Sequence, residues 1–155
     1  MDRDPKRVAS FVFCNPAPGV DPSRADALET VAKTAESGGI RAILPQMLDR
    51  SFPPELSDPR LYEIYRGRYI ANDPVGFGLA FRVLATTDKR PSLAKIAVPT
   101  LVIGGTKDVV RPVAGTEALA GTIPGARFAA IEAEHFISVN NPQALLAQLL
   151  DLFPH

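Results

Sequence analysis

Three short apolar runs are the clearest feature of the chain, and they cover residues 8–15, 100–105 and 127–133. Each run is nearly continuous in apolar residues rather than alternating with polar ones, and prolines or glycines lie at one end of each. A short continuous run of this kind is typical of a strand that is buried on both faces, as in a parallel sheet. We therefore predict three strands that belong to one parallel sheet.

Helical spacing separates the predicted strands. Asp21 or Ser23 can cap the start of a helix that continues to about Ser37, where two glycines end it. Apolar residues at helical spacing, with prolines at the first turns and between segments, predict the remaining helices. These helices are expected over residues 40–50, 59–72, 74–87, 112–123 and 142–153.

The order of these elements indicates the fold class. The second half of the chain alternates strand, helix, strand and helix, which predicts a parallel sheet with right-handed crossovers. Residues 20–92 are too long for a simple crossover, so we expect several helices inserted at one edge of the sheet. The first strand has no charged residue to protect an exposed edge and is expected to have a neighbour. The prediction is an α/β protein with about three parallel strands flanked by helices.

Composition narrows the class of protein. A length of 155 residues suits one domain, and 46% apolar with 22% charged residues is typical of a globular protein. A formal net charge of zero and the lack of a basic stripe argue against a nucleic-acid partner. No apolar run is long enough to cross a membrane, and no signal-like segment begins the chain, so we expect a cytoplasmic protein. One cysteine and two widely separated histidines predict neither a metal nor a cofactor.

Two polar residues follow the second and third predicted strands, namely Asp108 and His135. The carboxyl ends of parallel strands meet at one edge of a sheet, where catalytic groups gather. A helix of about 12 residues runs about 18 Å back along the sheet, and the next strand returns. Asp108 could thus orient His135 as a general base. Alternatively, Asp108 is a turn or cap carboxylate before Pro112, and His135 is an ordinary hydrogen-bonded histidine.

Residues 93–153 strongly resemble the C-terminal end of the α/β-hydrolases. The shared motifs are I-x-x-P-T-L-V-I-x-G-x-x-D, then I-P-G-A, then a histidine loop before N-P. This resemblance implies that Asp108 is the acid of a catalytic triad and His135 its histidine. The implied activity is ester or lactone hydrolysis, with a small-molecule ester or lactone as substrate.

The earlier residues also resemble this family. The stretch KRVASFVFCNPAP is similar to the strand that follows the nucleophile helix. The resemblance implies a single partial α/β-hydrolase domain over residues 1–155, with a first strand and loop (1–19), a helical cap (20–92) and a C-terminal core (93–155). The segments FCNPA and DPVGFGLAFRVLATTD resemble the 3-oxoadipate enol-lactonase-like branch in particular.

The chain departs from the family at the nucleophile. The family places its serine on a G-x-S-x-G elbow ahead of the acid and histidine, and this sequence contains no such motif. The expectation is a C-terminal portion of a hydrolase, inactive by itself, whose nucleophile and oxyanion hole were lost or lie elsewhere. The alternative is a non-catalytic binding module, or a homo-oligomer that forms through the exposed first strand.

Overall fold

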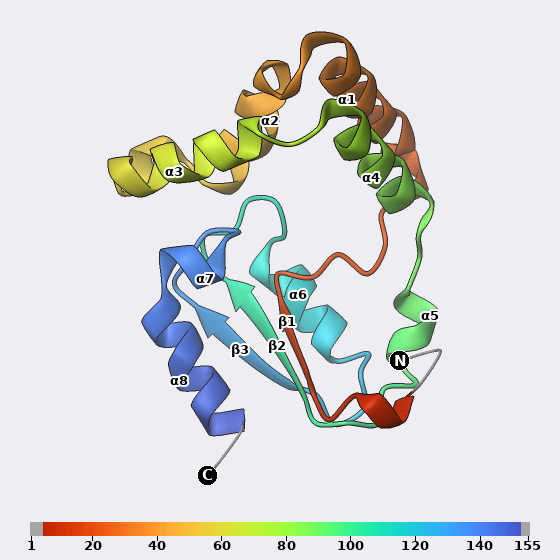
Figure 1. Cartoon of the computed structure of the whole chain (residues 1–155). Helices are drawn as coiled ribbons and strands as arrows, with labels where there is room; N and C mark the ends of the chain where they lie inside the picture. The colour runs from red at the N-terminus through yellow and green to blue at the C-terminus, as the bar shows by residue number, and fades with distance from the viewer. Residues whose placement is uncertain (1–4, 153–155) are drawn as a thin grey trace. The chain divides into compact units, whose positions relative to one another are not determined.

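The computed structural model describes residues 5–152 (Figure 1). The chain divides into two compact units. We call Pro18–Asp88 the helical unit. The segments on either side of it, Met1–Ala17 and Lys89–His155, together form the sheet unit. The sheet unit is thus built from two stretches of chain that are far apart in the sequence.

Three parallel strands form the sheet, in the order β1 (Phe11–Cys14), β2 (Thr100–Gly105) and β3 (Arg127–Ile131). The central strand, β2, is buried at all six positions, which explains its uninterrupted apolar sequence. The prediction of three parallel strands flanked by helices is confirmed. Two of the strands are shorter than the apolar runs that predicted them, because residues at the ends of those runs belong to loops.

Successive residues of a strand point to opposite sides, so the sheet has two apolar faces. Helices cover both of them. One face packs against the helix α6 (Val113–Ala120) and the segment around α5 (Arg90–Leu93). The other face packs against α7 (Ile137–Asn140) and α8 (Pro142–Leu152). The cores of the two faces contain, respectively, Leu93, Ile96, Val102, Ala120 and Ile123, and Leu101, Ile103, Ile131, Ala133 and Ile137.

The remaining elements are short 3-10 turns and the helices of the helical unit. They are η1 (Pro5–Arg7), η2 (Pro22–Arg24), α1 (Ala25–Gly38), η3 (Ile40–Ile43), α2 (Leu44–Ser51), η4 (Pro54–Leu56), α3 (Pro59–Ile70) and α4 (Pro74–Thr86). Asp58 and Asp73 cap α3 and α4 through their carboxylates. The single helix predicted over 40–50 is instead a 3-10 turn followed by α2. Pro45 explains the break, because it has no N–H to bond the carbonyl of Arg41.

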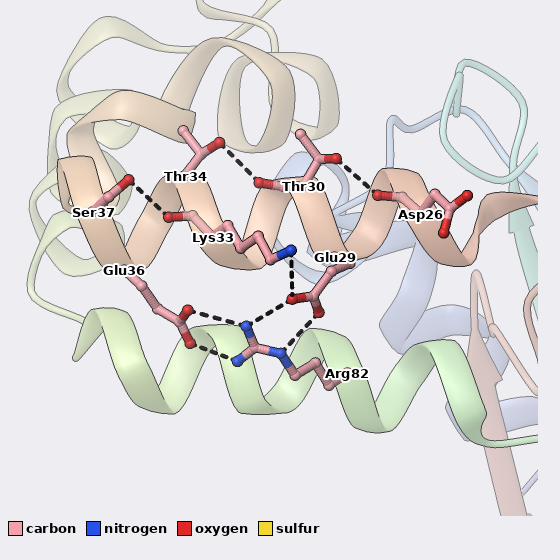
Figure 2. Close-up of polar contacts among 8 residues, drawn as sticks. All are labelled: Asp26, Glu29, Thr30, Lys33, Thr34, Glu36, Ser37 and Arg82. Carbon is pink, nitrogen blue, oxygen red and sulfur yellow. Dashed lines mark hydrogen bonds and ion pairs between the residues drawn. The ribbon is translucent and has the colours of Figure 1, made fainter.

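Arg82 of α4 ties this helix to α1 by binding two carboxylates at once (Figure 2). Its Nε lies 2.8 Å from Glu29 Oε2, and its Nη2 lies 3.0 Å from Glu36 Oε2. Gly78 leaves room for this arrangement, since a Cβ there would lie 2.6 Å from Glu36 Oε1. The guanidinium therefore lies between two glutamates that would otherwise repel each other across about two turns of α1.

This cluster predicts an acid-dependent stability. The hydrogen bonds from Arg82 lower the pKa of both Glu29 and Glu36. The stabilisation of the folded protein by these two ion pairs is therefore fully present above about pH 4.5. It is lost as the pH falls through the lowered pKa values of the two glutamates. We expect Arg82→Gln to flatten the dependence of the free energy of unfolding on pH below that value, as measured by urea unfolding. The matched variant Arg66→Gln, which removes an exposed pair within α3, should leave the dependence unchanged. Parallel pH profiles for Arg82→Gln and the parent would contradict this account.

Candidate active site

Asp108 lies in the loop that follows β2, and its side chain is completely buried. The backbone turns sharply after the strand, with the N–H of Asp108 donating to the carbonyl of Gly105 at 3.2 Å. Oδ1 of Asp108 accepts hydrogen bonds from the backbone N–H groups of Val110 at 2.7 Å and Arg111 at 2.8 Å. One carboxylate oxygen thus holds the loop that leads into α6, as the turn interpretation of Asp108 predicted.

The other carboxylate oxygen of Asp108 contacts His135. Nδ1 of His135 lies 2.7 Å from Oδ2 of Asp108, and both residues belong to the sheet unit. The imidazole is 24% exposed, whereas the carboxylate is not exposed at all. The structure therefore brings together the two residues that the sequence singled out. Oδ1 of Asp108 thus serves the turn, and Oδ2 is the oxygen that meets the imidazole. The other histidine, His155, lies outside the described residues.

The electrostatics of the pair determine its hydrogen-bonding state. Burial raises the pKa of Asp108, but the hydrogen bond from His135 and the backbone N–H groups of Arg111 and Val110 together lower it below its ordinary value. The carboxylate is therefore ionised at neutral pH and can only accept hydrogen bonds. Nδ1 of His135 must then be the donor, and in the neutral imidazole Nε2 carries the lone pair that can accept a proton. An imidazole held in this tautomer by a carboxylate can act as a general base.

Gly105 at the end of β2 allows the histidine loop to approach closely. A Cβ at this position would lie 2.5 Å from the carbonyl oxygen of Ala133 and 2.7 Å from that of Glu134. Just beyond it, the N–H of Thr106 donates to the carbonyl of Ile131 at 2.9 Å. Glycine is therefore required at the end of β2, because the backbone that leads to His135 lies directly against it.

Sequence reasoning missed two residues beside this pair: Gly105, and Asn15, whose carboxamide bonds the backbone of Gly105 and of His135. Gly105 was only part of a motif, and Asn15 was only the end of an apolar run. The signal for Gly105 is its fixed place three residues ahead of Asp108.

Among the described residues, no group of three or more His, Cys, Asp or Glu side chains is placed to hold a metal ion. No helix within residues 5–152 is long and apolar enough to span a membrane.

The fold and the acid–histidine pair agree with the family comparison. The profile of the alpha/beta hydrolase fold family matches residues 1–142, so the chain belongs to this family. Its relatives include 3-oxoadipate enol-lactonase 2 of Acinetobacter baylyi, 28% identical over 142 residues that cover 90% of this chain and 52% of that protein. The chain is thus an α/β-hydrolase family protein, as the sequence motifs predicted, and it is similar at low identity to 3-oxoadipate enol-lactonases.

Solved structures give the same assignment. The enol-lactonase from Burkholderia xenovorans is 26% identical, with a TM-score of 0.86 over 96% of this chain and 57% of that one. A hydrolase from Pseudomonas aeruginosa is 29% identical, with a TM-score of 0.85 over 97% of this chain and 57% of that one. The chain spans little more than half the length of these relatives.

Proposed function

We propose that this chain supplies the acid and the histidine of a serine-hydrolase triad that cleaves an ester or a lactone. The main support is the 2.7 Å contact between Nδ1 of His135 and the fully buried carboxylate of Asp108. In a serine hydrolase such a pair has an established use: the carboxylate orients the imidazole and stabilises its protonated form. The enol-lactonases among the relatives support an ester or lactone as the substrate class.

The proposed reaction needs a nucleophile that the 155 residues do not contain in recognisable form. No G-x-S-x-G elbow is present, because no serine has a glycine both two positions before it and two positions after it. These serines are Ser10, Ser23, Ser37, Ser51, Ser57, Ser92 and Ser138. We propose that the serine and the oxyanion donors come from residues outside this sequence, and that the 155 residues alone are inactive.

With such a serine in place, Nε2 of His135 takes the hydroxyl proton as the serine oxygen attacks the substrate carbonyl. The imidazolium, stabilised by Asp108, then returns this proton to the departing alcohol oxygen as the acyl–oxygen bond breaks. A water molecule, deprotonated in turn by His135, releases the acid and restores the serine. In a lactone the departing oxygen stays attached to the product.

A fusion protein, which we call the joined protein, tests this proposal. The part of the Acinetobacter baylyi enol-lactonase 2 that this chain does not match is fused to residues 1–155, and hydrolysis of p-nitrophenyl acetate is measured. We expect the joined protein to turn over the ester and His135→Ala to lower kcat by about a thousandfold or more. Ser138→Ala, at an exposed position near the histidine, is the matched control and should retain the rate.

Two results would refute the proposal. One is turnover by the 155 residues alone. The other is a folded joined protein whose activity is absent or does not depend on His135.

The free edge of β1 supports a second candidate, self-association. Within the described part of the chain, β1 pairs with β2 on one side only. Its residues Phe11, Val12 and Phe13 are half-buried rather than buried. An apolar edge strand can pair with another chain, including a second copy. If it does, sedimentation should show a dimer mass that disappears in Val12→Lys, and a monomer in the parent chain would exclude this candidate.

A further inference from the structure

Asn15 lies directly after β1 and has an unusual backbone conformation. Its φ is 45°, and no other non-glycine residue between residues 5 and 152 has a positive φ. Asparagine tolerates this left-handed conformation better than most residues. The residue is only 4% exposed, although it is polar and stands at the end of an edge strand. A buried polar residue in this uncommon conformation points to a specific role for its side chain.

The carboxamide of Asn15 bonds to both of the segments that present the acid–histidine pair. Its Nδ2 donates to the carbonyl oxygen of His135 at 3.0 Å and to that of Glu134 at 3.3 Å. Its Oδ1 accepts from the N–H of Gly105 at 2.8 Å, three residues before Asp108. The backbone N–H of Asn15 donates to the carbonyl of Ile103 at 2.9 Å. One side chain thus joins the ends of β1 and β2 to the histidine loop.

These bonds are not the local ones that asparagine usually makes in a turn. An asparagine in a left-handed conformation commonly bonds backbone groups two to four residues away. Those of Asn15 instead reach partners 90, 119 and 120 positions away. They therefore contribute to the placement of distant segments relative to each other, and not to the shape of the turn at Asn15 itself.

We propose that Asn15 is a positioning residue that holds the backbone of residues 134–135 so that the His135 imidazole meets Asp108. Its catalytic meaning rests on the function proposed above. A carboxamide is the suitable group, because it can donate to two carbonyls and accept from an N–H at the same time. A carboxylate in its place would face two carbonyl oxygens without a proton to offer. An apolar side chain would remove the partner of three buried or partly buried backbone groups.

Asn15→Gly tests this proposal, since glycine accepts a φ of 45° and removes only the carboxamide. The 155-residue chain is labelled with ¹⁵N-histidine, and the Nδ1 proton of His135 is followed by NMR. Only two histidines are present, so His135→Gln assigns the signal. We expect exchange of this proton with water to become about tenfold faster or more, as after the loss of a buried hydrogen bond. The amides of β2 residues 101–103 should keep their exchange rates within about twofold.

Asn72→Gly is the matched control. Asn72 donates its carboxamide to the carbonyl of Tyr69 at 2.8 Å in the helical unit, and its loss should leave the His135 signal unchanged. An unchanged His135 signal in Asn15→Gly would overturn the proposal. So would an equal acceleration of the His135 proton and the β2 amides, because that result would show a loss of stability only.

This readout is independent of turnover, so it can be separated from the proposed function. If the joined protein is inactive while Asn15→Gly still disturbs His135, the positioning stands and the hydrolase assignment fails. In an active joined protein, Asn15→Gly should lower kcat by about tenfold or more with little change in KM, since the substrate itself is not contacted. A change in KM alone would count against positioning.

Discussion

Asp108→Asn is expected to lower kcat of the joined protein by about ten-thousandfold, the size of effect found when a triad acid loses its charge. The substituted side chain can still accept hydrogen bonds from the N–H groups of Val110 and Arg111, so the loop should keep its shape. Its amide nitrogen, however, would face Nδ1 of His135 where a carboxylate oxygen accepts at 2.7 Å in the parent. His135 would then place its proton on Nε2, the nitrogen that must be free to act as a base.

The measurement is steady-state ester hydrolysis at neutral pH, with Glu132→Gln as the matched control. Glu132 is an exposed carboxylate on the same loop as His135 and pairs with Lys107, so its loss should change kcat by less than about twofold. Asp108→Ala should add a loss of stability of about 1–3 kcal/mol, because it leaves two backbone N–H groups unpaired. An Asp108→Asn variant with more than a tenth of the parent kcat would show that the acid is structural only.

Gly105→Ala is expected to separate the histidine from the acid and to destabilise the sheet unit by about 1–3 kcal/mol. The added Cβ would lie 2.5 Å from the carbonyl oxygen of Ala133 and 2.7 Å from that of Glu134. Both contacts are with backbone, which cannot move aside as the end of a flexible side chain can. The backbone of residues 133–134 must therefore rise away from β2 and take His135 with it.

Urea unfolding and the Nδ1 proton signal of His135 together test this prediction. Gly115→Ala is the matched control, because a Cβ in this position of α6 meets nothing within 4 Å. That change should stabilise the helix by about 0.5–1 kcal/mol. If Gly105→Ala is as stable as the parent and keeps the His135 signal, the histidine loop does not depend on the close approach to Gly105.

The parallel sheet could be predicted because its central strand is buried on both faces. The run at Thr100–Gly105 is continuous for that reason, and the crossover between β2 and β3 has the length of one helix. The region of residues 40–50 was harder, because its apolar spacing suits one helix. Pro45 stands inside that spacing and breaks the ladder of hydrogen bonds, so a 3-10 turn precedes α2.

The site, like the fold, could be predicted from the sequence only in part. Asp108 and His135 could be predicted from their places after two strands, and the resemblance to the α/β-hydrolases singled out the same pair. Asn15 could not, because its partners lie 90 to 120 residues further along the chain. The need for glycine at residue 105 likewise depends on how closely another loop approaches it. Spacing along one sequence predicts which strand ends meet, but not the backbone contacts that hold them at bonding distance.

We propose that this chain holds an acid–histidine pair whose nucleophile comes from residues outside the 155. Covalent labelling by a fluorophosphonate probe tests it most directly, with the 155-residue chain and the joined protein compared by mass spectrometry. We expect no labelling of the chain alone. In the joined protein we expect labelling at the G-x-S-x-G serine, slowed by about a hundredfold or more in His135→Ala, the range of general-base assistance. Labelling of a serine within the 155 residues, or labelling of the joined protein at the same rate without His135, would contradict it.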